Sequence, residues 1–205
     1  MAEDICQVTQ GVGVKLHTNS YVAGGQTVHD EFVVPGPYPY ATYIVSPAAG
    51  VTCANAGDDI AQLMAGASLK LRIVRIRLEQ AQLITAAALT AFTIARVTTA
   101  GTGGTAITPS KMDNADGAAG AAAASGVPTA SKGAIGAQFF VRQIQPTQTA
   151  ATAGQLTPYW EWTASTIAKG ILIPTGATNG LVIRNVSARA GLSVNFEIEF
   201  VETTF

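Results

Sequence analysis

Residues 194–200 read Val-Asn-Phe-Glu-Ile-Glu-Phe, so every second side chain is large and apolar while the others are polar or acidic. Alternation over seven residues is the pattern of a β-strand that turns one face to a core and the other to solvent. Shorter runs before it indicate further strands, at 138–145, 159–163, 170–173 and 181–186. The C-terminal third of the chain is therefore expected to be built from strands.

Residues 69–79, LKLRIVRIRLE, alternate in two different phases. The apolar residues occupy odd positions up to Ile73 and even positions from Val74 onward. A slip of one residue would turn every later side chain to the opposite face of the sheet. We therefore predict a β-bulge or a bend near Ile73 and Val74, which absorbs the extra residue.

One segment favours a helix over a strand. The apolar side chains within residues 54–67 fall at helical spacing, and Asp58 or Asp59 could cap the N-terminal end. We expect at most one short helix, of two or three turns.

The remaining patterns predict an all-β fold, a jelly-roll-like sandwich. Strands are expected at 8–16, 32–34 and 89–97, with a turn over 19–26. Because the strands are short and separated by Gly, Pro and Asn, they indicate two packed sheets and not a helical or α/β domain.

We expect a single domain over residues 1–205. Residues 1–50 are a possible N-terminal arm or set of edge strands, since Pro35, Pro37 and Pro39 cannot donate to a sheet ladder. Residues 98–132, rich in Thr, Gly, Ala and Ser, are expected to form a long loop excursion.

The composition argues against several classes of function. Only 12% of the residues are charged, 48% are hydrophobic and the net charge is −1. A general nucleic-acid binder needs a basic surplus, and an enzyme usually concentrates titratable groups. The chain has neither a membrane-length apolar run nor an apolar signal sequence after its acidic start, so we expect synthesis and solubility in the cytoplasm.

The sequence suggests no catalytic residue, cofactor or metal site. His17 and His29 lack the paired ligand spacing of a zinc site. Residues 113–117, DNADG, lack the full calcium-loop pattern and indicate an Asx-rich turn, while the glycines of 101–104 are not followed by a helical pattern. Cys6 and Cys53 are interpreted as free thiols, although a single bridge between them stays open.

Two clusters are candidates for contacts with a partner. The basic residues Lys70, Arg72, Arg75 and Arg77 form either a solvated strand face, which we favour, or a contact with an acidic partner. Tryptophan pairs in β-sandwiches serve as core or interface anchors more often than as sugar platforms. The candidate interface residues are Tyr38, Tyr40, Phe139, Phe140, Tyr159, Trp160, Trp162, Arg72 and Arg75.

Residues 96–109, RVTTAGTGGTAITP, followed by an Asp-bearing Ala-rich stretch, resemble small virion structural proteins of tailed bacteriophages, of the head-decoration and the head- or tail-associated kind. The rhythm of residues 170–174, 181–185 and 196–200 is similar to the closing strands of jelly-roll trimers.

The resemblance implies a non-enzymatic capsid decoration (cement) protein in the virion. Its partners would be its own copies, with a homotrimer favoured, and the major capsid protein or another virion protein. Neither nucleic acid nor membrane is expected as a partner. The alternative is a receptor- or glycan-binding module of a fibre head or tail, which would use Trp160 and Trp162 as an exposed platform. Buried tryptophans would favour the structural role, and exposed ones sugar binding.

Overall fold

The computed structural model forms two compact units, Met1–Pro39 and Tyr40–Phe205. It describes residues 17–23, 26–32, 40–84, 89–146, 159–164 and 170–204. The predicted strand over 8–16 and candidate interface residue Tyr38 lie outside these ranges.

In the first unit, β1 (His17–Ala23) pairs antiparallel with β2 (Gln26–Phe32). Ala23 lies opposite Gln26, so only Gly24 and Gly25 separate the strands. The turn predicted over 19–26 is therefore wrong for residues 19–23, which belong to β1, and for Gln26, which begins β2. Two residues are enough to connect a hairpin, and glycine is a favoured choice there.

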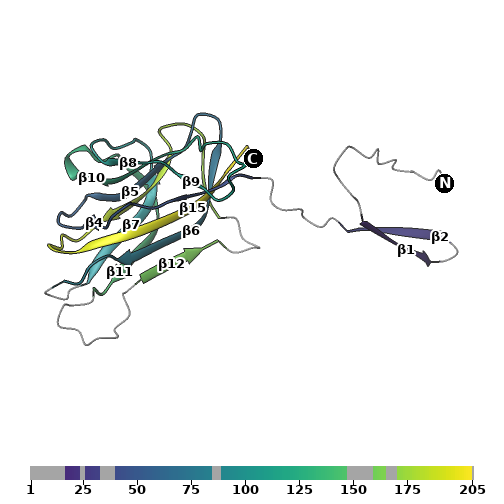
Figure 1. Cartoon of the computed structure of the whole chain (residues 1–205), viewed down its shortest axis with the longest axis horizontal. Helices are drawn as coiled ribbons and strands as arrows, with labels where there is room; N and C mark the ends of the chain where they lie inside the picture. Colours follow the sequence, from purple (N-terminus) through teal and green to yellow (C-terminus); the bar gives the residue numbers. More distant parts are fainter. Residues whose placement is uncertain are drawn as a thin grey trace. The chain divides into compact units, whose positions relative to one another are not determined.

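The second unit is a sandwich of two antiparallel sheets, which confirms the all-β prediction (Figure 1). The sheet that we call the β5 sheet has the order β11-β7-β14-β5-β10-β8. Its strands are β5 (Asp59–Met64), β7 (Thr90–Val97), β8 (Thr105–Ile107), β10 (Ala122–Val127), β11 (Ile135–Ile144) and β14 (Gly180–Asn185).

The facing sheet, which we call the β6 sheet, has the order β12-β6-β15-β3-β9, with β13 also beside β6 and β4 beside β15. Its strands are β3 (Thr42–Val45), β4 (Val51–Thr52), β6 (Lys70–Gln80), β9 (Ser110–Lys111), β12 (Tyr159–Thr163), β13 (Ile171–Ile173) and β15 (Ser193–Thr203). β3 already belongs to the sandwich, which thus begins within the range expected as an arm.

The core lies between the two sheets. Phe92 of the β5 sheet and Phe196 and Phe200 of the β6 sheet are its largest fully buried side chains. Fully burying an apolar side chain of this kind contributes roughly 1.5–3 kcal/mol. Residues 194–200 alternate between buried and partly exposed positions as predicted, because one face of β15 meets this core.

The predicted irregularity in the strand over 69–79 is confirmed. β15 pairs Phe200 with Ile73 and Glu199 with Arg75, so Val74 is the extra residue. Ile73 and Ile76 on either side of it are fully buried. The bulge keeps both halves of β6 facing the same core.

The helix predicted over residues 54–67 is wrong, since β5 occupies its centre. All six residues of β5 are buried. β14 pairs Ile183 with Ala61 and Arg184 with Asp59, which leaves Ile60 as an extra residue. The added residue breaks the two-residue period, and burial on both faces removes the polar half of the pattern, so the spacing looks helical.

Residues 98–132 are also more ordered than predicted. They contain β8, β9, β10 and one turn of 3-10 helix, η1 (Thr129–Ser131), in place of a plain loop. β10 pairs with both β5 and β8, and β9 pairs with β3. Small residues can form these strands because the ladder is made by the backbone.

Deletion of Val74 should be tolerated, because β6 would then alternate in a single phase and still pair Ile73 and Arg75 with β15. Deletion of Arg77 should unfold the sandwich or destabilise it by several kcal/mol, because it would turn Leu78 out of the core, at a cost of roughly 1.5–3 kcal/mol for that side chain alone. Urea unfolding of the two variants measures the difference. Equal destabilisation would contradict the bulge assignment.

Candidate functional site

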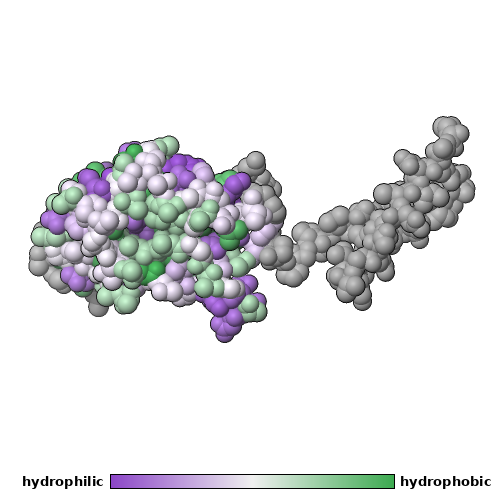
Figure 2. Space-filling model, turned by 90° about the horizontal axis from the view of Figure 1, so that it is seen from above, coloured by the Kyte–Doolittle hydropathy of each residue, from purple (hydrophilic) through white to green (hydrophobic). Residues whose placement is uncertain are grey.

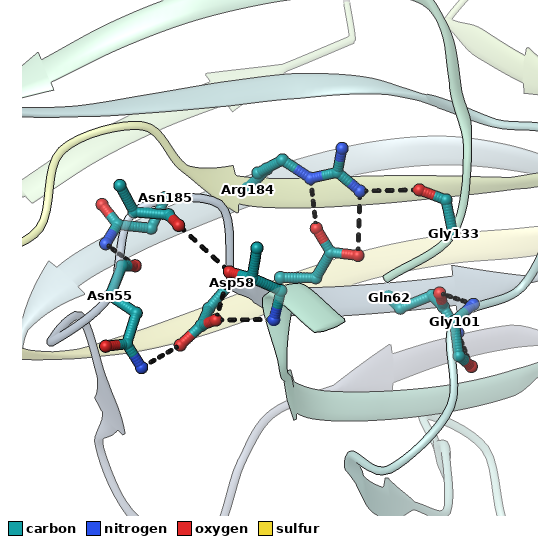
Figure 3. A network of polar contacts seen from close by, with 10 residues as sticks. Asn55, Asp58, Gln62, Gly101, Gly133, Arg184 and Asn185 are labelled. Atoms are coloured by element: carbon teal, nitrogen blue, oxygen red, sulfur yellow. Dashed lines mark hydrogen bonds and ion pairs between the residues drawn. The ribbon is translucent and has the colours of Figure 1, made fainter. Parts of the chain in front are cut away.

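Among the described residues, the buried charged side chains that most resemble an active site lie on the outer face of the β5 sheet. Arg184 of β14 donates to both carboxylate oxygens of Asp59 on β5, at 2.5 and 3.2 Å, and to the carbonyl oxygen of Gly133 at 2.9 Å (Figure 3). The Asp59 side chain is fully buried, and that of Arg184 is 11% exposed. Burial raises the pKa of Asp59, and the hydrogen bonds and charge of Arg184 oppose this shift.

Asp58 makes a second set of contacts beside this pair. Its carboxylate accepts hydrogen bonds from the Thr129 backbone N–H at 2.8 Å, the Thr129 hydroxyl at 2.6 Å and the Asn55 amide at 3.0 Å. Burial alone would raise the pKa of Asp58, but these hydrogen bonds together with the positive charge of Lys132 bring it below its ordinary value of 3.8. Asp58 is thus held as a charged acceptor that fixes η1 to the start of β5.

These side chains fasten a segment that we call the strap, residues 98–104 and 128–134, to the β5 sheet. Gln62 accepts from the Gly101 backbone N–H at 2.7 Å and donates to its carbonyl oxygen at 3.4 Å (Figure 3). Thr102 donates its backbone N–H to the Ser131 carbonyl oxygen at 2.9 Å, which joins the two halves of the strap. A Cβ at Gly133 would overlap the Thr99 carbonyl oxygen, so only glycine permits this approach.

The network is structural and offers no open reactive group. Each carboxylate in it already accepts hydrogen bonds from the protein, and no group of three His, Cys, Asp or Glu residues in the described part of the chain could hold a metal ion. Cys53 is a free, buried thiol, and burial together with the charge of Asp58 raises its pKa to about 12. It therefore stays protonated and unreactive in the folded protein.

The basic cluster predicted on β6 is balanced by carboxylates of the same sheet. Arg75 lies 3.3 Å from Glu199 and 3.7 Å from Glu197, and Arg77 lies 3.2 Å from Glu79 and 3.8 Å from Glu197. These side chains are about one-fifth to two-fifths exposed, so each pair contributes at most about 1 kcal/mol. This arrangement suits a solvated strand face better than a contact with an acidic partner.

Three of the predicted interface residues, Phe140, Trp160 and Trp162, meet at one side of the sandwich. β11 is the last strand of the β5 sheet and β12 the last of the β6 sheet, and they lie side by side at this edge (Figure 1). The Phe140 ring lies 5.9 Å from that of Trp160 and 5.7 Å from that of Trp162. The three rings are half-buried against the core, and Tyr159 beside them is 62% exposed.

Arginine side chains cover the aromatic rings at this side. The Arg142 guanidinium lies 4.9 Å from the centre of Phe140 and 5.4 Å from that of Trp160. Arg96 lies 5.2 Å from the centre of Phe139. Neither arginine forms an ion pair with a carboxylate of the described residues, in contrast to Arg75 and Arg77. One N–H of Arg142 donates to the Val141 carbonyl oxygen at 3.0 Å, and the other donors of a guanidinium stacked in this way can reach an anion.

We call this region the aromatic edge and define it as Arg96, β11 and β12. Val141 of β11 is 52% exposed, and among the described strands β11 pairs only with β7. Two register shifts interrupt the ladder between Ile135 and Phe140, while residues 140–144 pair regularly. The aromatic edge therefore combines apolar side chains, cations and a strand edge that no described strand covers. Such a combination can bind an extended partner chain.

The other predicted interface residues lie apart from the aromatic edge or contribute little to it. Tyr40 is half-buried at the start of the sandwich, and Arg72 is exposed on the outer face of the β6 sheet. Sequence reasoning missed Arg96, Val141 and Arg142. In the sequence, the one signal for Val141 and Arg142 was their place after Phe140 in a strand with alternating residues.

In the part of the chain that the structure describes, no helix is long and apolar enough to cross a membrane. The face of the sandwich drawn in Figure 2 is largely pale and green, with hydrophilic residues in small separate groups.

No family model matches the chain, and comparisons with curated proteins and with solved structures find no match.

The substitution Asp58→Asn should lower the free energy of unfolding by about 1–3 kcal/mol at neutral pH, because the strap loses a charged acceptor. Since folding lowers the pKa of Asp58, its contribution is complete above 3.8 and fades as the pH falls further. The difference between wild type and variant should therefore shrink between pH 5 and about pH 2. Urea unfolding across this range, with the exposed Asp113→Asn as control, measures it; a pH-independent difference would contradict the charged role of Asp58.

Proposed function

We propose that the protein is a non-enzymatic structural protein of a tailed-bacteriophage virion, a decoration (cement) protein that bridges capsid subunits on the outside of the head. The observation that carries the proposal is the aromatic edge. There, aromatic rings, guanidinium groups without an ion pair among the described residues, and a strand edge free of described strands occur together. The buried polar side chains on the β5 sheet, by contrast, are used to hold the strap. The buried polar side chains thus stabilise the fold, and the aromatic edge remains as a surface for assembly.

We also infer that the sandwich is a jelly roll. Taken along the chain, its main strands are β3, β5, β6, β7, β11, β12 with β13, β14 and β15. Numbered one to eight in that order, they lie as 1-8-3-6 in the β6 sheet and 2-7-4-5 in the β5 sheet. This order supports two interlocked Greek keys, an architecture common in viral capsid and lectin domains. Strands β8–β10 are then an insertion between the fourth and fifth strands.

The proposed mode of action is association through the aromatic edge, in a homotrimer or another cyclic homo-oligomer and against the capsid. The half-buried rings would act as anchors, and the edge of β11 would accept a further strand. An obligate interface of this kind buries on the order of 2,000 Å² or more. The low charge content of the chain leaves little repulsion between copies.

A receptor- or glycan-binding module is the second candidate. It is favoured by Tyr159, which is 62% exposed and has the Arg77 guanidinium 5.5 Å from its ring centre. Sugar platforms use exposed rings, however, and both tryptophans are half-buried against Phe140 and the core. This burial favours the structural role.

Substitution of Val141 by lysine should weaken self-association by at least about tenfold, because it places a charge in the centre of the proposed interface. The substitution of Val186 by lysine is a matched control. Val186 is exposed to a similar extent as Val141 (48% against 52%) and lies beyond the end of β14. Sedimentation at micromolar concentration measures the association of both variants. Equal association of V141K and wild type, or a wild-type chain that sediments as a single 21.0 kDa species, would contradict a self-assembling edge.

The position of the protein in a purified particle tests the virion role itself. Antibodies against the sandwich should label the outside of the head at many regularly spaced sites. Labelling confined to the fibre tips or tail would support the receptor-binding alternative. Particles without any label would contradict both.

A further inference from the structure

The two units of the chain carry opposite net charge. Residues 1–39 contain Glu3, Asp4, Asp30 and Glu31 against a single basic residue, Lys15, which gives a net charge of −3. Residues 40–205 contain the other 11 Lys and Arg and the other nine Asp and Glu, a net charge of +2. The small overall charge of −1 thus hides a separation between an acidic N-terminal unit and a basic sandwich.

The N-terminal unit also has an incomplete sheet. β1 and β2 are seven residues each and pair only with one another among the described strands. A hairpin of two strands is marginally stable in water, and it becomes stable when a third strand or another surface joins it. The hairpin therefore fits an element that docks on a sheet edge.

The aromatic edge supplies what such a hairpin lacks. Residues 140–144 of β11 form a regular strand whose second side is free of described strands. Arg142, on that strand, and Arg96, on neighbouring β7, stack on aromatic rings and have no ion-pair partner among the described residues. An acidic strand would pair with the backbone of β11 and offer a carboxylate to the face that the two cations share.

We propose that the β1–β2 hairpin of one copy of this chain adds to the β11 edge of a second copy, so that the acidic end of β2, Asp30 and Glu31, brings one carboxylate to the face that Arg96 and Arg142 share. This inference rests on the proposed function, because it names the partner of the aromatic edge. Such a contact joins two different surfaces, so copies follow one another head to tail. It closes into a ring when the rotation between copies permits, which is how a trimer would form.

A charge exchange tests the proposal on the full chain. The double variant D30K/E31K makes the hairpin basic, and R96E/R142E makes the aromatic edge acidic. Each variant alone should lose self-association at least about tenfold, because like charges meet. An equimolar mixture should regain association, because the hairpin of each variant then meets the edge of the other. Two of the three contacts of a trimer can be satisfied in this way, and every contact of a ring with an even number of copies. Sedimentation of the single variants and of the mixture measures this.

Recovery in the mixture also shows that both variants are folded. R96Q/R142Q, which removes the charge without reversing it, is a second check if R96E/R142E is unfolded by circular dichroism; it should lower association less than the reversal does. Undiminished association of D30K/E31K would overturn the hairpin proposal, as would a mixture of folded variants that stays dissociated. If V141K still weakens association in that case, the aromatic edge survives as an interface with a different occupant.

Discussion

The ion pair between Asp59 and Arg184 is the contact on which the arrangement of the β5 sheet depends. Two charges buried on a sheet face are costly unless each is fully paired, and removal of one partner from such a pair typically costs about 3–5 kcal/mol. Here the carboxylate accepts two hydrogen bonds from the guanidinium, and the Nη2 group of the same guanidinium also donates to the Gly133 carbonyl oxygen. The pair is therefore satisfied only while the strap lies over it. Glu202 of the β6 sheet holds a second part of the segment between β7 and β11 by accepting hydrogen bonds from the Gly120 and Ala121 backbone N–H groups.

This arrangement determines which surfaces remain for a partner. The strap covers the polar outer face of the β5 sheet, where Asp59, Gln62 and Arg184 are buried. Ion pairs within β6 and between β6 and β15 balance Arg75 and Arg77 on the outer face of the β6 sheet. The side formed by β11 and β12 differs from both, because its cations rest on aromatic rings and one strand edge is free of described strands. This contrast between the two faces and the β11 edge supports the proposed assembly role.

The strands that could be predicted from the sequence are those with one face toward the core and the other toward solvent. The alternation of β15 and the bulge at Val74 in β6 could be predicted, because each strand has one buried face and one solvated face. β5 could not, since it is buried on both faces and bulged at Ile60. The order within residues 98–132 was missed because it depends on backbone pairing and on partners far along the chain. Asp59 and Arg184 are 125 residues apart, and nothing local to either predicts their pairing.

The candidate site was predicted in part for the same reason. Phe140, Trp160 and Trp162 stood out as large aromatic residues in strands, and the structure brings them together. The proposed role of Arg96 and Arg142 depends on their having no ion-pair partner among the described residues, which only the folded arrangement reveals. Once the boundary after Pro39 is known, the difference in net charge between the N-terminal unit and the sandwich can be read from the sequence.

Hydrogen–deuterium exchange of the full chain at a series of protein concentrations tests the central claim, that the edge of β11 is a pairing surface, most directly. Amides of residues 140–144 that do not bond to β7 should exchange more slowly as the concentration rises, while those of β14, inside the sheet, stay unchanged. Exchange of the β11 amides that is the same at all concentrations at which the protein associates would contradict the claim.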